Sequence, residues 1–345
     1  MKIKILLLSI TFIFLSYSFC TQPNWQEMAT LESFLEAHDF SGSILIAKKG
    51  NIIFKKSFGY ANFEDKTPNT EHTKFCIGSL TKTVTAAAIM KLQEQRLLNV
   101  NDPIGTFITD FPCGDFITIH DLLTHTSGIP DFTRDMDFYN CTGLEEMITY
   151  CKHKSFIKSE RSYHYSNYGY FLLAYIIQKV SGKSYEQFIT EALRVPFATG
   201  EHRAIGYEFA SEVKCAGEVK KRAPIFEHPL TLLGNGNLAA SLEDMYAWDQ
   251  ALFSGNIIAI ESLNTMLTPH IMMKDSQTRF HGYGFFIDTI NGKRVAEYSG
   301  YVRGFLSKHI HFLDEDITII VLSNVADVDS FIKMCDAIPA IVFNL

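Results

Sequence analysis

The chain has 345 residues, of which 47% are hydrophobic and 20% are charged. This composition is typical of a globular protein with one large or two modest domains, and it excludes a disordered chain or a collagen-like repeat. Acidic residues number 38 against 31 basic ones, which gives a formal net charge of -7. Nucleic-acid-binding proteins usually carry an excess of basic residues, so we expect no nucleic-acid partner.

The first twenty residues have the pattern of an export signal. Lys2 and Lys4 precede an apolar run at residues 5–15, which is shorter than the roughly 20 residues needed to span a membrane. Ser18 and Cys20 are small enough to precede a cleaved bond, so residues 1–20 are predicted to be a signal peptide. We therefore expect an exported protein, periplasmic or secreted. Two alternatives, a lipidated Cys20 or an uncleaved signal, would anchor it to a membrane.

The remaining cysteines permit disulfides in an exported protein. They are Cys76, Cys113, Cys141, Cys151, Cys215 and Cys335. Cys141 and Cys151 are the first pair to test, and buried thiols are the equal alternative. No CxxC pair occurs, so the spacing matches no zinc site.

In chain order, the patterns predict strands at both ends and helices between them. Apolar residues spaced three and four apart predict a helix from residue 25 to about residue 38. Residues 78–268 are mostly helical in pattern, and residues 328–343 form a last helix that can kink at Pro339. The predicted strands lie at residues 43–47, 52–58, 283–289, 294–298, 305–312 and 317–322.

This order predicts an α+β fold in which one antiparallel sheet is built from both chain ends and is flanked by the terminal helices. Residues 21–75 and 281–345 would form the sheet region. Residues 76–280 would form an inserted, mainly helical region, with a cleft where the insert meets the sheet.

Ser79 and Lys82 open a helix just after Gly78, and their spacing of three places both side chains on one face of its first turn. A serine needs a base to become a nucleophile, and burial would lower the pKa of a lysine in the required direction. The same spacing occurs from Ser155 to Lys158 and from Ser330 to Lys333. The spacing alone is therefore weak evidence, and a helix cap with a solvated lysine is the plain alternative.

Two further elements could complete a site. Tyr165 and Asn167 precede an apolar helix, where a phenol can share a proton with a lysine and an amide can bind a substrate carbonyl. Residues 297–305 lie between two predicted strands, and Gly300 would let the backbone approach a substrate closely.

Together and in this order, the three elements resemble the serine β-lactamase and penicillin-binding protein family, and most closely its class C and DD-peptidase branch. The resemblance covers nearly all of the chain after the predicted signal and implies a β-lactamase-like fold without a metal or organic cofactor. Supporting stretches lie at residues 41–47, 58–62, 119–131, 179–185 and 234–241.

The resemblance also implies residue roles. Ser79 would attack the carbonyl, Lys82 would take or relay its proton, and Tyr165 would share a proton with Lys82 and later help activate water. Asn167 would bind the acyl amide of the substrate or orient Lys82. The backbone amides of Ser79 and Tyr301 would form the oxyanion hole. The substrate-binding candidates are Asn167, Tyr298, Ser299, Gly300, Tyr301 and Arg303.

Two departures from the family pattern limit the substrate prediction. Tyr298 stands where a lysine or histidine usually begins the third element, and a neutral phenol cannot offer a cation to a substrate carboxylate. Our hypothesis is that Arg303 supplies this charge. Residues 158–161 replace the usual Pro-Gly turn before Tyr165.

We therefore predict an exported serine hydrolase that forms an acyl-enzyme on Ser79 and acts on an ester or a D-amino-acid amide or peptide. The alternatives are a DD-carboxypeptidase or weak β-lactamase and, in another class, a non-catalytic module that binds peptidoglycan or a protein. Partners beyond a small-molecule or peptide substrate are not indicated. His309 and His311 share a strand face and could bind a metal, but no third ligand is evident, so surface or packed histidines are the favoured interpretation. His125 is interpreted as structural.

Overall fold

A computed structural model of the protein describes residues 25–131, 141–153, 161–194, 203–208, 232–274 and 276–343. The predicted signal at residues 1–20, with Cys20, lies outside this part of the chain, as do Cys215 and residues 158–160 of the unusual turn. None of the helices in this described part combines the length and the hydropathy of a membrane-spanning segment.

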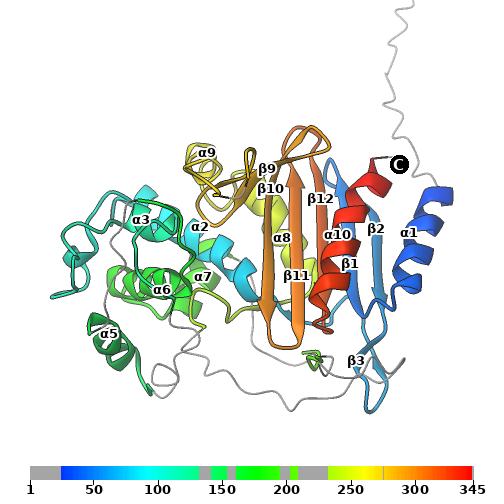
Figure 1. The fold of residues 1–345 in the computed structure, drawn as a ribbon, viewed down its shortest axis with the longest axis horizontal. Helices are drawn as coiled ribbons and strands as arrows, with labels where there is room; N and C mark the ends of the chain where they lie inside the picture. Colours follow the sequence, from blue (N-terminus) through cyan, green and yellow to red (C-terminus); the bar gives the residue numbers. More distant parts are fainter. Residues whose placement is uncertain are drawn as a thin grey trace, which may run out of the picture.

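An antiparallel sheet of eight strands forms the centre of the fold (Figure 1). Its order is β2-β1-β12-β11-β10-β9-β8-β7, so the N-terminal strands β1 and β2 form one edge and β1 pairs directly with β12, the last strand in the chain. β1 pairs with β12, with Gly42 opposite Ser323, which confirms the predicted sheet built from both chain ends. The strands are β1 (Gly42–Lys48), β2 (Asn51–Phe58), β7 (Ile271–Met272), β8 (Phe280–His281), β9 (Phe286–Ile290), β10 (Lys293–Val302), β11 (Phe305–Phe312) and β12 (Ile317–Ser323).

β10 is longer than the sequence pattern predicts. Its pairing with β11 continues through Ser299, Gly300 and Tyr301 to Val302, which lies opposite Phe305. Gly300 therefore belongs to the strand itself and not to a loop between two strands. This difference matters for the site, because a strand holds its backbone amides in fixed positions.

One face of the sheet is covered by the two terminal helices, α1 (Trp25–Ala37) and α10 (Val328–Val342) (Figure 1). Leu31 of α1, Phe331 of α10 and Val321 of β12 belong to one buried apolar cluster. α10 continues through Pro339, so the helix extends past the position where we allowed a kink.

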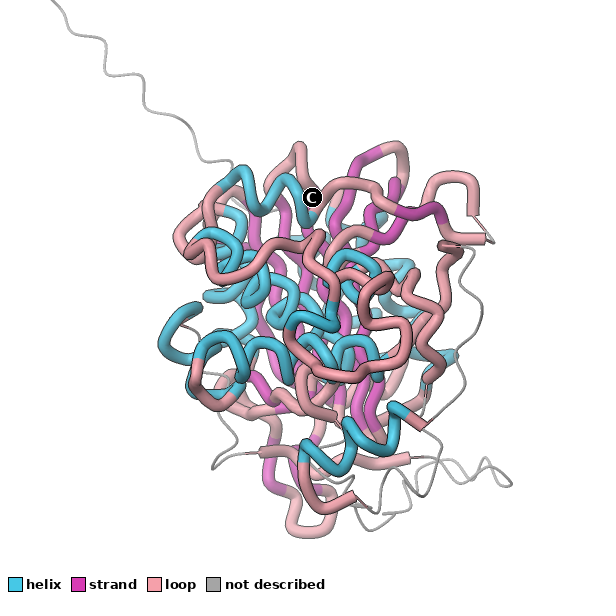
Figure 2. Tube along the Cα trace, turned by 90° about the vertical axis from the view of Figure 1, so that its left-hand side faces the viewer, coloured by secondary structure: helices cyan, strands magenta, loops and turns pink. Residues whose placement is uncertain are grey.

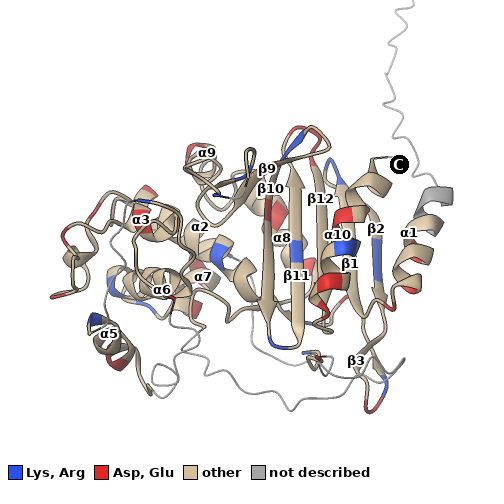
Figure 3. Cartoon of the chain, viewed as in Figure 1, with Lys and Arg blue, Asp and Glu red and all other residues tan. Residues whose placement is uncertain are grey.

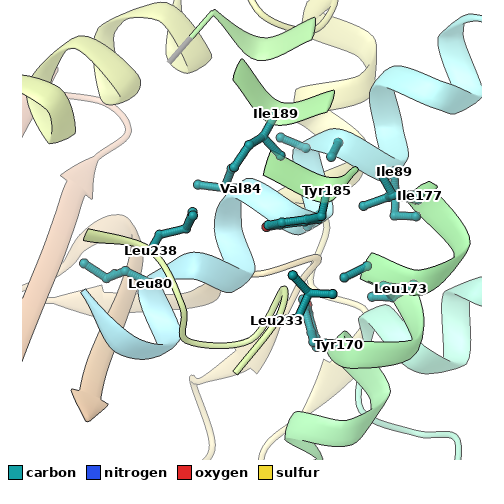
Figure 4. Packing of buried hydrophobic residues seen from close by; sticks show 14 of the residues in the cluster. Leu80, Val84, Ile89, Tyr170, Leu173, Ile177, Tyr185, Ile189, Leu233 and Leu238 are labelled. Atoms are coloured by element: carbon teal, nitrogen blue, oxygen red, sulfur yellow. The ribbon is translucent and has the colours of Figure 1, made fainter. Parts of the chain in front are cut away.

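The other face carries the helical part of the chain, which stands in front of the strands in Figure 2. α2 (Thr81–Glu94) and α8 (Leu242–Phe253) are its inner helices. Val84 of α2, Ile177 of α6 and Tyr185 of α7 pack in its apolar core (Figure 4). The other helices are α3 (Ile119–Leu123), α5 (Leu144–Lys152), α6 (Asn167–Ser181), α7 (Tyr185–Leu193) and α9 (Ile260–Met266). The short elements are η1 (Gly78–Leu80), η2 (Ile104–Thr106), β3 (Tyr60–Asn62), β4 (Thr67–Pro68), β5 (Phe75–Cys76) and β6 (Ala239–Ala240).

A buried polar network joins α8 to the sheet. The Asp249 carboxylate is fully buried and lies 2.8 Å from His309 Nε2 and 3.0 Å from His311 Nδ1, and it accepts a 2.7 Å bond from Thr318. These bonds hold the pKa of the carboxyl below its usual range against the opposing effect of burial. His309 and His311 are thus packed histidines that bind a carboxylate. Elsewhere, basic and acidic residues are interspersed along the helices and strands (Figure 3).

Cys141 and Cys151, the pair chosen for a disulfide test, are both buried thiols in the structure. For this pair, the structure therefore agrees with buried thiols and not with a disulfide.

Candidate active site

Ser79 lies in η1, at the entrance to α2, and directly against β10. Gly78 has a φ of +50°, in the left-handed region that favours glycine. A β-carbon on Gly78 would lie 2.9 Å from the backbone N, C and O atoms of Tyr301. Glycine is therefore required both by the backbone conformation and by the close approach to Tyr301. Because Gly78 has no side chain, the backbone next to Ser79 can lie against the backbone of Tyr301.

Lys82 is fully buried one turn after Ser79 and has three hydrogen-bond acceptors around its ammonium group. Its Nζ lies 3.1 Å from Ser79 Oγ, 2.6 Å from Asn167 Oδ1 and 2.9 Å from the Asn235 carbonyl oxygen. Burial lowers the Lys82 pKa to about 7, and the negative charge of Asp131 opposes this shift. A substantial neutral fraction is therefore present near neutral pH, and neutral Lys82 can accept a proton from Ser79.

Asn235 was not recognised as a site residue from the sequence. It lies in the turn at residues 232–236, in which the Gly234 carbonyl accepts a 2.7 Å bond from Thr85 of α2. The turn falls within the family-like stretch 234–241, but its contribution to the site is a backbone oxygen. A backbone contact leaves no signal in residue type, so the sequence could not identify it.

Tyr165 completes a connected set of side chains at Ser79. Its hydroxyl lies 2.8 Å from Ser79 Oγ, and Lys82 Nζ lies 5.0 Å from the centre of its ring. The residue keeps 36% of its surface exposed, but the loss of water around its phenol raises the pKa to about 12. Tyr165 is therefore protonated at neutral pH and can act as a proton donor.

His125 holds the segment that carries Tyr165. Its carbonyl accepts a 2.8 Å bond from the His164 amide, and its Nδ1 accepts a 3.2 Å bond from the Ser166 amide. The ring is buried 4.6 Å from the Tyr165 ring, and burial lowers its pKa well below the usual value. His125 is thus neutral and supports Tyr165 from both sides.

Asn167 is placed by the start of α6. The Ser166 side chain caps this helix by accepting a 3.1 Å bond from the Gly169 amide, which puts Asn167 at the first helical position. Its Oδ1 faces Lys82, and its Nδ2 donates a 3.0 Å bond to Asp131 Oδ2. Asp131 ends the family-like stretch 119–131, but the sequence did not mark it as a site residue.

Tyr298 is buried beside the site, with 2% of its surface exposed. Its ring stacks on Phe286 at a centroid distance of 5.0 Å. Burial raises its pKa well above the usual value, so the phenol is neutral. Its hydroxyl makes no hydrogen bond within the described part of the chain, although it lies near enough to Tyr165 to affect that residue's pKa. The structure therefore places Tyr298 behind Tyr165 and not as an open contact for substrate.

Gly300 lies where β10 packs against Ile77, the residue before η1. A β-carbon there would be 1.9 Å from the Ile77 carbonyl oxygen and 2.4 Å from Ser307 Oγ. The next residue, Tyr301, keeps 55% of its surface exposed. Gly300 thus brings the strand against the turn that holds Ser79.

The side chains of the remaining substrate-binding candidates contact residues other than Ser79 and Lys82. These candidates are Ser299, Tyr301 and Arg303. Ser299 Oγ accepts a 3.2 Å bond from Lys308 on β11. The Tyr301 hydroxyl donates a 3.3 Å bond to Glu208 Oε1, and Arg303 Nε lies 3.9 Å from the same oxygen. The charge of Arg303 is therefore partly neutralised by a carboxylate.

Comparison with known proteins agrees with this geometry. A family model described as Beta-lactamase matches residues 29–336. The chain is 29% identical over 317 residues to penicillin-binding protein 4* of Bacillus subtilis (strain 168), covering 85% of this chain and 70% of that protein. It is 30% identical over 158 residues to a teichoic acid D-alanine hydrolase of Staphylococcus aureus, covering 46% of this chain and 39% of that protein.

The fold agrees as well. The structure of an octameric penicillin-binding protein homologue from Pyrococcus abyssi aligns with a TM-score of 0.79 at 27% identity, over 93% of this chain and 77% of that chain. The predicted α+β fold with a β-lactamase-like sheet is therefore confirmed. The chain belongs to the beta-lactamase family, and the relatives that it matches include a hydrolase and penicillin-binding proteins.

Proposed function

We propose that the protein is an exported serine hydrolase that forms an acyl-enzyme on Ser79. The observation that carries this proposal is the fully buried Lys82, whose Nζ lies 3.1 Å from Ser79 Oγ and whose pKa is lowered to about 7. A general base works best when its pKa lies near the operating pH. A solvated lysine would be protonated there and could not take the serine proton.

In the first half-reaction, Ser79 Oγ attacks the carbonyl carbon of the substrate while its proton passes to neutral Lys82. The resulting ammonium keeps two acceptors, Asn167 Oδ1 and the Asn235 carbonyl. The amides of Ser79 and Tyr301 bind the oxygen that gains negative charge. Tyr165 gives its proton to the leaving oxygen or nitrogen as the bond to the carbonyl carbon breaks, and Lys82 restores that proton.

In the second half-reaction, water attacks the ester carbonyl on Ser79. Its proton passes to the Tyr165 and Lys82 pair, and the bond to Ser79 Oγ breaks as that oxygen regains a proton. The pair then returns to its starting state. Water supplies the only added atoms, so the two half-reactions need no reactant other than the substrate and water.

The surroundings of β10 favour an ester or a D-amino-acid amide as the substrate. Tyr298 is neutral and buried, and Arg303 lies beside Glu208, so neither offers a fully available cation to a substrate carboxylate. A relative named for hydrolysing D-alanine from teichoic acid supports this class. The relationship to a penicillin-binding protein keeps a DD-carboxypeptidase or weak β-lactamase as the second candidate. Export rests on the pattern of residues 1–20 alone.

The test is labelling with a fluorophosphonate probe, followed by intact mass. Ser330→Ala is the matched control, because Ser330 and Lys333 have the same spacing as Ser79 and Lys82 but lie on the exposed side of α10. We expect one adduct on the wild type and on Ser330→Ala, and none on Ser79→Ala. An unlabelled wild type would favour the non-catalytic binding module, and an adduct on Ser79→Ala would identify another nucleophile. Turnover of an ester, a D-alanyl amide, a D-alanyl-D-alanine peptide and a cephalosporin then separates the enzyme candidates.

A further inference from the structure

Asp131 lies on the opposite side of Asn167 from Lys82. Asn167 Nδ2 donates a 3.0 Å bond to Asp131 Oδ2, while Asn167 Oδ1 accepts a 2.6 Å bond from Lys82 Nζ. One amide group therefore bridges a carboxylate and the buried amine beside Ser79.

The two neighbours determine which way the amide faces. An ionised carboxylate can only accept hydrogen bonds, and an ammonium group can only donate them. With Asp131 in place, the NH2 group of Asn167 must face the carboxylate, so its oxygen must face Lys82. Without that acceptor, the amide could rotate by half a turn and present its NH2 group to the ammonium, and this contact is repulsive.

We propose that Asp131 is a positioning residue, which orients the Asn167 amide so that its oxygen holds the Lys82 amine at Ser79. The inference rests on the proposed function, since it assigns a role within the same site. It requires no direct contact between Asp131 and the substrate.

The charge of Asp131 also affects the pKa of Lys82, and this effect can be measured separately from the orientation of the Asn167 amide. The titratable groups around Lys82 are Tyr165, Tyr170, His125, His281 and Asp131. Burial keeps the two tyrosines protonated and the two histidines neutral at pH 7, because it raises the pKa of the phenols and lowers the pKa of the imidazoles. Asp131 is thus the charged neighbour among the described residues. Its negative charge favours the ammonium form, so removing it should lower the Lys82 pKa.

Two variants separate the geometric effect from the charge effect. Asp131→Asn keeps an oxygen that can accept from Asn167 but loses the charge, and Asp131→Ala loses both. Glu36→Gln on α1 is the control, because it removes one exposed negative charge on the opposite face of the sheet. The rate of fluorophosphonate labelling is measured from pH 5 to pH 9, and thermal unfolding checks that each variant is folded.

At pH 9, where Lys82 is largely neutral in every variant, a reversed Asn167 amide would donate to the lone pair with which Lys82 accepts the Ser79 proton. We therefore expect Asp131→Ala to be labelled about 10- to 100-fold more slowly than the wild type. Asp131→Asn should stay within a few-fold of the wild type at that pH. In both variants, the rise of the labelling rate with pH should move to lower pH. A merely structural role would lower the rate or the melting temperature without moving this rise.

A double variant tests the route through Asn167. In an Asn167→Ala background, Asp131→Ala should have little further effect on the rate at pH 9, because no amide remains to be oriented. The inference is overturned if Asp131→Ala is labelled as fast as Glu36→Gln at pH 9. It is also overturned if the double variant slows labelling by the product of the factors of Asn167→Ala and Asp131→Ala, because the two residues would then act independently. An unlabelled wild type would instead contradict the proposed function, so the two failures are distinct.

Discussion

The Ser307 hydroxyl donates a 2.7 Å hydrogen bond to the Ile77 carbonyl, which joins β11 to the residue two positions before Ser79. Both residues are fully buried. The same carbonyl oxygen occupies the space that a β-carbon on Gly300 would need. Backbone contacts with the central strands therefore fix the position of the nucleophile, and the sheet acts as a rigid support for the turn.

A methyl group at this contact should displace the turn. We expect Gly300→Ala to lower the free energy of unfolding by about 1–3 kcal/mol, because neither Ile77 nor β10 can move without disturbing the sheet. Labelling of Ser79 should fall by at least about 100-fold, since a displacement of roughly 1 Å has effects of this size. Urea unfolding and the labelling rate measure the two effects.

Gly143→Ala is the matched control for this substitution. A β-carbon on Gly143 would meet no atom within 4 Å, and its φ of -150° suits any residue. It should therefore leave the labelling rate close to that of the wild type, and its cost in stability should be limited to that of alanine at the N-cap of α5. If Gly300→Ala behaved like Gly143→Ala, the contact would be looser than the structure indicates.

His125 should matter for activity although it does not touch Ser79. His125→Leu removes the acceptor of the Ser166 amide and places a branched residue at a φ of +58°, where such residues are strained. We expect slower labelling, by about 10-fold or more, and a loss of roughly 1–3 kcal/mol in the free energy of unfolding. His125→Asn tolerates this φ and should be the more stable of the two. Equal stability of the two variants would show that the backbone conformation contributes little.

Strand periodicity is a local property, and the sequence therefore predicted the antiparallel sheet. The spacing of Ser79 and Lys82 was weak evidence by itself, and the order of the three motifs was needed to single out this pair. The sequence also brought Tyr165 and Asn167 to attention through a local pattern. Asp131, His125 and the Asn235 carbonyl were not assigned to the site, because each acts through a contact made only after folding. The burial of Tyr298 was also missed, since it depends on packing against Phe286.

Arg303 and Glu208 provide a test of substrate charge. We expect Arg303→Ala to lower kcat/KM for a D-alanyl-D-alanine peptide by roughly two- to five-fold relative to a neutral ester, a small effect because Glu208 partly neutralises the guanidinium. Glu208→Gln keeps an acceptor for the Tyr301 hydroxyl but releases Arg303, so it should shift the same ratio in the opposite direction. If neither variant changes the ratio, Arg303 does not contact the carboxylate end of the substrate.

Lys82 should make the protein's stability depend on pH. Its pKa is about 7 in the folded protein and 10.5 when solvated, so the unfolded chain binds more protons between these values. The stability of the wild type should therefore rise with pH across this window and level off below about pH 7, where Lys82 is protonated in both the folded and the unfolded chain. Relative to Lys82→Met, which cannot titrate, we expect a gain of roughly 2 kcal/mol from pH 7 to pH 9.

The slope with pH, and not the absolute stability, is the test of this prediction. Lys82→Met leaves Asn167 Oδ1 and the Asn235 carbonyl without their donor, and this loss lowers stability equally at each pH. Lys333→Met, at an exposed lysine of α10, should follow the wild type across the range. Urea unfolding at pH 6, 7, 8 and 9 gives the slopes. Parallel curves for the wild type and Lys82→Met would mean that Lys82 remains protonated in the folded protein, and the general-base role would then need another residue.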